Sequence, residues 1–170
     1  PLISVITVVF NNASKLEQTI QSVINQSNCN IQYIVIDGGS TDGTVEILQQ
    51  YEYQIDYWVS EPDQGIYNAM NKGLTLANGN WVNFMNSGDC LNDLNFTLEG
   101  DIFYGSTVAN YPNKCRISYP QNLQSINNDI IASHQSVLFS NSVYRKYYYN
   151  NSFHYGADYF LLLKLFFENK

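Results

Sequence analysis

The stretch Leu2-Ile3-Ser4-Val5-Ile6-Thr7-Val8-Val9 is almost continuously apolar and rich in β-branched side chains. Such a run is typical of a strand that is buried on both faces of a parallel sheet. Shortly after it, Ser14-Lys15-Leu16-Glu17 matches a capping box, and Leu16, Ile20 and Val23 recur at helical spacing. These residues predict a central strand, a short loop and a helix, in that order.

The same alternation continues through the first half of the chain. Strands are predicted at 31–36, 55–60 and 80–86, with helices after Gly43 and over 65–77. Strands that alternate with helices predict an α/β fold with a largely parallel central sheet. The second half is less regular, with predicted strands at 102–108 and 135–139, an irregular Asn-, Pro- and Tyr-rich segment at 110–129, and a helix over 157–167.

The composition limits both the domain count and the partners. A chain of 170 residues that is 45% hydrophobic fits one domain with one substantial core. Only 14% of the residues are charged, the net charge is -7, and Lys plus Arg number eight. Because binding to a nucleic-acid backbone needs clustered cations, nucleic acid is not expected as a partner. A surface that is polar mainly through Asn, Gln, Ser and Tyr suits neutral, hydroxyl-rich ligands.

The cysteines and the hydropathy indicate a compartment. Cys29, Cys90 and Cys115 are odd in number, and no two of them have zinc-ligand spacing. No apolar segment approaches the roughly 20 residues needed to span a bilayer, and no secretory leader is recognised. We therefore expect a soluble, reduced, cytoplasmic protein, with peripheral contact at the inner face of the membrane left open.

Polar clusters follow each predicted strand of the first half. They are Asn11-Asn12, Asp37 to Asp42, Glu61-Pro62-Asp63, and Asn86-Ser87-Gly88-Asp89. In α/β sheets, ligands bind outside the carboxyl ends of the strands, where loops and helix N-termini gather. The sequence therefore predicts one binding site built from these four clusters.

Two interpretations of the second cluster remain open. Asp37 could accept the N–H of a uracil-like base, with the neighbouring glycines letting a flat ring approach the backbone. Alternatively, Asp37 only shapes the turn. For Asp42 we favour the structural role, which is capping the next helix.

Three further residues are candidates for chemistry. Asp89 ends a buried strand and suits a hard cation such as Mg or Mn, with phosphate oxygens and water completing the coordination. Asp158 stands where the last helix should begin, and a helix N-terminus favours the ionised form of a carboxyl group that is to accept a proton. Helix capping is an equal alternative for Asp158. His134 could contact phosphate or acceptor, although a single His is more often structural.

Four motifs in order resemble family 2 glycosyltransferases of the GT-A fold, in particular bacterial enzymes that build surface polysaccharides. They are Ile6-Thr7-Val8-Val9-Phe10-Asn11, Ile36-Asp37-Gly38-Gly39-Ser40-Thr41-Asp42-Gly43-Thr44, Ser60-Glu61-Pro62-Asp63-Gln64-Gly65-Ile66-Tyr67-Asn68-Ala69-Met70-Asn71-Lys72-Gly73, and Asn86-Ser87-Gly88-Asp89. A thinner match continues in His134-Gln135 and Gly156-Ala157-Asp158-Tyr159. The resemblance implies a GT-A, Rossmann-like α/β/α sandwich with a mostly parallel sheet.

The resemblance also implies a donor site for a nucleotide-sugar, with a UDP-sugar favoured. The residues it assigns to donor binding are Val9, Asn11, Asp37, Gly39, Asp63, Lys72 and Ser87. Asp89 matches the last acid of the family's D-x-D-type motif and would hold a Mg or Mn cation. Ser87 stands where the first acid is often found, so a single protein carboxylate would hold the metal.

On the acceptor side, the resemblance assigns Asp158 the role of catalytic base. It would deprotonate a hydroxyl of a saccharide or lipid-linked saccharide, which then displaces the nucleoside diphosphate with inversion. Residues 1–170 would form a single GT-A domain, with a donor half at 1–89 and an acceptor half at 90–170. Family members usually continue past the last helix, so we expect the chain to be C-terminally truncated or a minimal member.

Two other functions compete with this one. A catalytically silent nucleotide-sugar binding module of a larger assembly would bind the donor but release no nucleoside diphosphate. A nucleotidyltransferase would usually carry a Gly-rich phosphate loop with a basic residue after the first strand. Here that loop is Phe10-Asn11-Asn12-Ala13-Ser14-Lys15, which argues against this activity.

Overall fold

The protein, examined as a computed structural model, is an α/β structure described at residues 2–94, 97–112, 114–122, 125–126 and 131–168. Its first half alternates strands and helices as predicted: β1 (Leu2–Val9), α1 (Ala13–Ile24), β2 (Asn30–Asp37), α2 (Thr44–Gln50), β3 (Tyr57–Ser60), α3 (Ile66–Leu76) and β4 (Trp81–Asn86). The second half contains β5 (Ile102–Tyr104), β6 (Thr107–Tyr111), β7 (Lys114–Ser118), the 3₁₀ turn η2 (His134–Ser136), β8 (Val137–Ser140), α4 (Asn141–Tyr144) and α5 (Ala157–Glu168).

The central sheet has the strand order β3-β2-β1-β4-β8-β5. Strands β1 to β4 are mutually parallel, whereas β8 runs antiparallel to both β4 and β5. The alternation of the first half therefore produced the parallel part of the sheet. Local sequence does not determine the antiparallel edge. The position of β8 in the sheet depends on which strand it pairs with after the long segment that follows β4.

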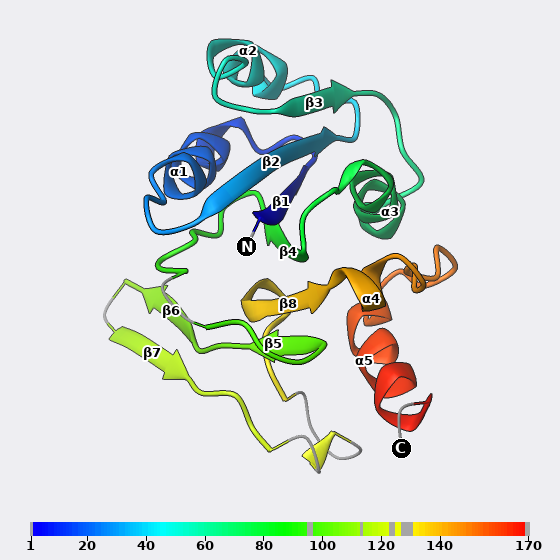
Figure 1. The fold of residues 1–170 in the computed structure, drawn as a ribbon. Helices are drawn as coiled ribbons and strands as arrows, with labels where there is room; N and C mark the ends of the chain where they lie inside the picture. The colour runs from blue at the N-terminus through cyan, green and yellow to red at the C-terminus, as the bar shows by residue number, and fades with distance from the viewer. Residues whose placement is uncertain (1, 95–96, 113, 123–124, 127–130, 169–170) are drawn as a thin grey trace.

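Helices cover both faces of this sheet (Figure 1), and the side chains of β1 show why. Ile6 and Val8 point to the face that packs against α3, α4 and α5. Ile3 and Val5 point to the opposite face, which packs against α1 and α2. Since alternate residues of a strand face opposite sides, a strand covered on both faces must be apolar throughout. Burial of β1 on both faces therefore explains why residues 2–9 are almost continuously apolar.

The start of α1 differs from the prediction. The helix begins at Ala13, and the residue preceding it, Asn12, makes no side-chain capping bond, so the capping box expected at Ser14 is wrong. Instead, Asp42 Oδ2 accepts a 2.9 Å hydrogen bond from the Ala13 backbone N–H. Asp42 Oδ1 also accepts from Thr44 N at 3.2 Å and Thr44 Oγ1 at 2.6 Å, at the start of α2. Asp42 thus serves the N-termini of two helices, as its structural interpretation required.

The region after β5 also differs. The strand predicted at 102–108 is divided after Tyr104 into β5, which pairs with β8 in the central sheet, and β6, which pairs with β7 in a separate two-stranded sheet. Within the segment predicted to be irregular, β7 pairs with β6 as a hairpin whose residues are largely exposed. An exposed two-stranded hairpin lacks the apolar alternation that identifies a strand, so the pattern missed it. Part of the predicted segment, residues 113, 123–124 and 127–129, lies outside the described residues.

The carboxyl ends of the parallel strands meet at one edge of the sheet, and backbone bonds join the loops there. Gly38 N donates to Val9 O at 3.0 Å, Ser87 N to Val8 O at 3.1 Å, and Glu61 N to Asp37 O at 3.1 Å. Four loops from distant parts of the sequence are therefore held together at this edge.

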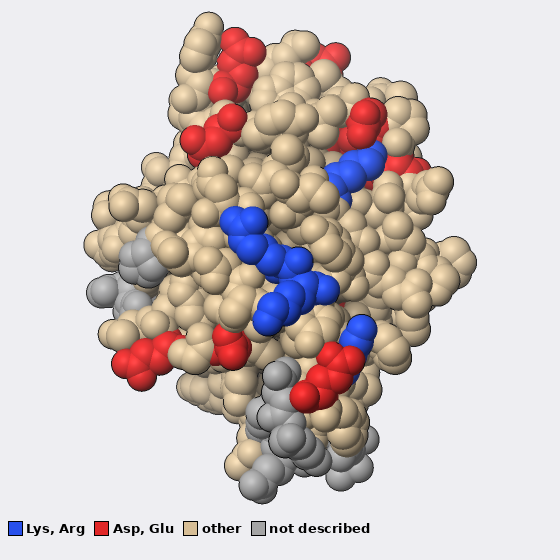
Figure 2. All heavy atoms as spheres, turned by 45° about the vertical axis from the view of Figure 1, so that its right-hand side comes forward, with Lys and Arg blue, Asp and Glu red and all other residues tan. Residues whose placement is uncertain are grey.

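On the face shown in Figure 2, Lys and Arg form only small groups on a mostly uncharged surface.

Candidate active site at the carboxyl edge of the sheet

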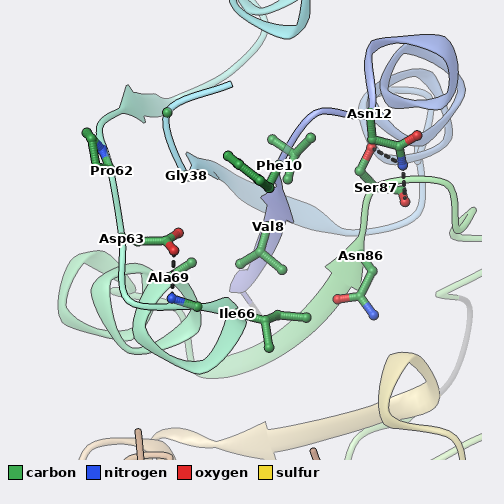
Figure 3. A pocket seen from close by; sticks show the side chains of 13 residues that line it. Val8, Phe10, Asn12, Gly38, Pro62, Asp63, Ile66, Ala69, Asn86 and Ser87 are labelled. Carbon is green, nitrogen blue, oxygen red and sulfur yellow. Dashed lines mark hydrogen bonds between the residues drawn. The ribbon is translucent and has the colours of Figure 1, made fainter. Parts of the chain in front are cut away.

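A cavity of about 750 Å³ opens at the carboxyl ends of the parallel strands (Figure 3). All four polar clusters of the first half contribute to it, together with the start of α3. Its lining residues are Val8, Val9, Phe10, Asn12, Gly38, Gly39, Pro62, Asp63, Gly65, Ile66, Ala69, Asn86 and Ser87. This volume is that of an ordinary small-molecule site, and its position is where α/β sheets bind ligands.

Phe10, Gly38 and Asp63 form one wall of the cavity. The Phe10 side chain is 64% exposed, which is unusual for a large apolar group and leaves a ring face available to a ligand. Asp63 Oδ1 accepts a 2.8 Å hydrogen bond from Gly65 N. Asp63 Oδ2 lies 2.8 Å, and Phe10 Cδ2 3.3 Å, from the position that a Cβ on Gly38 would occupy. A ring atom of Phe10 and a carboxylate oxygen of Asp63 therefore approach the same point, and only glycine leaves that point open.

Asp37 is held by hydrogen bonds from its own turn and from the end of β3. It is fully buried, and its Oδ2 accepts from Gly39 N at 3.2 Å, Ser40 N at 3.0 Å and Ser60 Oγ at 2.5 Å. Its Oδ1 accepts from Ser40 Oγ. Asp37 does not line the cavity. This geometry favours the turn-shaping alternative, and a contact between Asp37 and a base stays a prediction.

Asn11 and Gly39 hold the same region. Asn11 has a positive φ of 47°, its N–H donates to Ser40 Oγ at 2.7 Å, and its Oδ1 accepts from Thr41 N at 2.9 Å. Asn11 thus ties two loops together and is not among the lining residues. Gly39, with φ 86°, lines the cavity where a Cβ would meet Pro62 N at 3.1 Å.

The loop from Asn86 to Asp89 is fastened to the first turns of α1. Asn12 Nδ2 donates to Ser87 O at 2.8 Å and to Ser87 Oγ at 3.2 Å. Thr19 Oγ1 accepts from Gly88 N at 2.8 Å and donates to Asp89 O at 2.8 Å. Helix α1 therefore fixes the position of Ser87, which lines the cavity, and of the Asp89 backbone.

Asp89 is partly buried beside groups from two other segments. Burial raises the pKa of its carboxyl group, while a hydrogen bond from the Gln135 side chain and the charge of Lys15 act in the opposite direction. Within the described part of the chain, no three His, Cys, Asp or Glu residues gather as a metal cluster. The assignment of Asp89 as the single protein carboxylate of a metal site stays a prediction.

The groups present near Asp89 suit a hard cation. Asn86 Oδ1 is buried, and across the described residues no hydrogen-bond donor reaches it. Ser87 Oγ and the Asp89 carboxylate add oxygen atoms on the same loop. Oxygen donors with few carboxylates are the environment in which Mg or Mn binds together with phosphate and water. A positive ion would also offset the burial of the Asp89 charge.

Asp158 lies in the first turn of α5, as predicted, and contacts helix α3. Tyr67 OH donates to Asp158 Oδ1 at 3.3 Å and accepts from Ala157 N at 3.1 Å. The carboxylate is only partly buried, so it combines one fixed protein partner with access from solvent.

His134 belongs to an aromatic cluster with Phe84 and Tyr149, near Asp158. Its ring stacks on Phe84 with centroids 5.3 Å apart, and its Nε2 lies 2.8 Å from Tyr149 OH. Burial lowers the pKa of His134 to about 4, although the nearby Asp158 charge acts in the opposite direction. His134 is therefore neutral near pH 7, as expected of a structural histidine. The adjacent Gln135 reaches Asp89, so the turn η2 lies between the two acids.

Lys72 lies outside the cavity. Lys72 Nζ forms a 2.8 Å ion pair with Glu61 Oε1, and Lys72 does not line the cavity. Its assignment to donor binding stays a prediction.

In the described residues, no helix is both long and apolar enough to cross a membrane.

Sequence patterns missed several residues that the structure brings to the site. Phe10 and Tyr67 lie inside the quoted motifs, but nothing in their spacing distinguished them from neighbours, whereas Asn12 belongs to a polar cluster that the sequence did assign to the site. The one available signal for Phe10 was an aromatic residue directly after a buried strand. Tyr149 carried no signal, since its role depends on a contact with His134 across the fold.

Comparison with known proteins agrees with this geometry. The model of the family "Glycosyl transferase family 2" matches residues 4–97, more than half of the chain. An uncharacterized glycosyltransferase of Mycobacterium tuberculosis is 46% identical over 90 residues, covering 52% of this chain and 34% of the relative. A protein named as the teichuronic acid biosynthesis glycosyltransferase TuaG of Bacillus subtilis is 43% identical over 93 residues, covering 52% and 36%. The chain thus spans about a third of the length of these relatives.

Solved structures support the fold at low sequence identity. S. aureus TarS 1–349 in complex with UDP-GlcNAc has a TM-score of 0.68 and 15% identity, covering 98% of this chain and 53% of that one. A mannosyltransferase of Pyrobaculum calidifontis in complex with GDP-Man and Mn²⁺ has a TM-score of 0.66 and 15% identity, covering 92% and 49%. The α/β/α sandwich with its mostly parallel sheet is therefore the GT-A fold. By its family match and its fold, the chain belongs to glycosyl transferase family 2.

Proposed function

We propose that this chain is the catalytic domain of an inverting glycosyltransferase that moves a sugar from a nucleotide-sugar, preferably a UDP-sugar, to a hydroxyl of a saccharide or lipid-linked saccharide in surface polysaccharide synthesis. The observation that carries the proposal is the cavity at the carboxyl edge of the sheet, with Asp63 in its wall and the loop of Asp89 beside it. Family membership supplies the class of chemistry.

The base of the nucleotide binds against Phe10. The exposed Phe10 ring provides a stacking surface, and Asp63 Oδ2 beside it can accept an N–H from the base. Uracil and thymine offer a single ring N–H of this kind, whereas guanine offers an N–H together with an amino group. The TarS structure was obtained with UDP-GlcNAc, which agrees with a uracil donor.

The diphosphate lies along the loop from Asn86 to Asp89. Ser87 lines the cavity, and Asp89 would hold a Mg or Mn cation that neutralises charge on the departing nucleoside diphosphate. The mannosyltransferase neighbour was solved with Mn²⁺. Because the protein provides one carboxylate, we expect the cation to bind weakly until the donor diphosphate supplies further oxygen ligands.

Asp158 acts as the catalytic base. Tyr67 occupies Oδ1, which leaves Oδ2 for the proton of the acceptor hydroxyl. The acceptor oxygen forms a bond to the anomeric carbon while the bond from that carbon to the diphosphate oxygen breaks. A single displacement of this kind inverts the anomeric configuration. His134, neutral near pH 7, does not place a competing positive charge beside Asp158.

A titration tests the donor site. Protein is titrated calorimetrically with UDP, GDP and dTDP, each with and without Mn²⁺, and Asp89→Ala is measured in parallel. Metal-dependent binding of one nucleotide that Asp89→Ala abolishes is the expected result. If no nucleotide binds under any condition, the donor site is wrong.

Turnover tests the enzyme against the silent binding module. Release of nucleoside diphosphate from the matching nucleotide-sugar is followed with a range of saccharide acceptors. Loss of this release in Asp158→Ala, with donor affinity kept, is expected of the enzyme. Donor binding without any release would favour the binding module instead.

A further inference from the structure

The Tyr67 hydroxyl joins two helices that lie far apart in the sequence, α3 and α5. It contacts the first backbone N–H of α5 and the carboxylate of Asp158, ninety-one positions away in the sequence. From this contact, and resting on the proposed function, we propose that Tyr67 is a positioning residue that holds the Asp158 carboxylate in its productive orientation.

The direction of the hydrogen bonds follows from the partners. The Ala157 backbone N–H can only donate, so the Tyr67 oxygen accepts from it at 3.1 Å. An ionised carboxylate can only accept, so the Tyr67 proton is directed to Asp158 Oδ1. Each group has one available role. The arrangement therefore fixes both the rotation of the hydroxyl and the oxygen of Asp158 that it occupies.

The Tyr67 ring is held in place by its neighbours. The side chain is buried, its ring centroid lies 5.5 Å from that of Tyr149, and Tyr149 in turn packs edge-on against Phe84 at 5.4 Å. Burial and the charge of Asp158 raise the pKa of Tyr67, so the hydroxyl keeps its proton throughout the neutral range. A buried ring with a retained proton is suited to positioning, since neither its place nor its charge changes.

The same helix also forms part of the donor cavity. Ile66 and Ala69, on either side of Tyr67 in α3, line that cavity, whereas Tyr67 packs into the core with Tyr149. A displacement of α3 on donor binding would thus move the Tyr67 hydroxyl that contacts the base. Tyr67 therefore links the donor half of the fold with the acceptor half.

Tyr67→Phe removes the hydroxyl and keeps the ring. The expected result with the full chain is a fall in the turnover of UDP-GlcNAc of between about 10-fold and about 100-fold, because a base displaced by about 1 Å loses effectiveness on this scale. The Kd for UDP with Mn²⁺ should stay within about two-fold, since Tyr67 does not line the cavity. Tyr144→Phe is the matched control, because it deletes another buried hydroxyl, one bonded to Gly79 O at 2.7 Å, away from Asp158.

A double-mutant cycle separates positioning from general stabilisation. Asp158→Ala alone should lower turnover strongly, and adding Tyr67→Phe to it should lower turnover by less than about two-fold more, since the base on which Tyr67 acts is already lost. Thermal unfolding of the same four proteins reports whether the contact is present, independently of activity.

The outcomes are distinct. If the two substitutions lower turnover independently, or if Tyr67→Phe lowers it no more than Tyr144→Phe, the positioning role is wrong. Additive changes in Tm would show that Tyr67 and Asp158 do not interact, which also overturns it. If wild-type protein binds UDP but releases none from any of a panel of UDP-sugars that includes UDP-GlcNAc, with any acceptor or water, the proposed function fails first, and the role of Tyr67 with it.

Discussion

Asp63 Oδ2 lies 2.8 Å from the point that a Cβ on Gly38 would occupy, so the backbone of one loop and the carboxylate of another leave no room for a side chain between them. The Phe10 ring borders the same point at 3.3 Å. A single absent methyl group therefore keeps open the part of the cavity to which we assign the base of the nucleotide.

Gly38→Ala should weaken nucleotide binding. The added methyl group must displace Asp63 or Phe10, and overpacking of this kind costs about 1–3 kcal/mol. Calorimetric titration with UDP and Mn²⁺ should show an affinity about 10-fold lower. Gly105→Ala is the control, because its Cβ would meet only ordinary contacts at 3.9 Å. Equal affinities for both variants would show that the base does not bind at this wall.

Phe10→Ala should also weaken binding, for a different reason. Stacking of a base on an aromatic ring contributes about 1–3 kcal/mol, so loss of the exposed ring should raise the Kd for UDP by about 10-fold or more. Phe10→Tyr keeps the ring and should retain affinity. The stability of Phe10→Ala should change little, because the side chain is 64% exposed in the free protein. Unchanged UDP affinity in Phe10→Ala would remove Phe10 from the donor site.

Asp89→Asn should separate stability from metal binding. Burial raises the pKa of the Asp89 carboxyl group in the folded protein. Between the pKa of the unfolded chain and this raised pKa, the folded protein holds a proton that the unfolded chain has lost. The contribution of Asp89 to the free energy of unfolding therefore falls as the pH rises through this range. At pH 7 the neutral amide of this variant should therefore raise the Tm. The Mn²⁺-dependent gain in UDP affinity should fall by at least about 10-fold. A lower Tm together with intact Mn²⁺ dependence would contradict both parts.

His134 should make the protein sensitive to mild acid. Its pKa is lowered from 6.5 to about 4 in the fold, so below about pH 6.5 the unfolded chain takes up a proton that the folded protein does not. The free energy of unfolding should thus fall by up to about 3 kcal/mol between pH 6.5 and pH 4. Urea unfolding at pH 7 and pH 4.5 measures this difference.

His134→Gln should reduce that pH dependence, while lowering stability at pH 7 through the lost contact with Tyr149. The exposed His154 provides the control, because His154→Gln should leave the pH dependence as it is in the wild type. A wild-type acid dependence that survives in His134→Gln would assign it to other groups.

The sequence by itself determined the parallel half of the fold. The β-branched run at 2–9 had to be a doubly covered central strand, and the alternation that follows it fixed the order of strands and helices. The position of the site followed as well, since polar clusters at four strand ends meet at one edge of a parallel sheet. Asp89 and Asp158 were placed at a strand end and a helix start for the same local reasons.

The tertiary structure alone decided what the candidate side chains touch. Asp37 accepts from four donors in its own turn and at the end of β3, whereas Asp63 lines the cavity, although both are acids at the carboxyl edge of the sheet. The pairing of Tyr67 with Asp158 arises only when α3 and α5 pack on the same face of the sheet. Local patterns report which element a residue occupies. Partners and pKa shifts depend on groups that folding brings together from distant segments, and no spacing in the sequence encodes those distances.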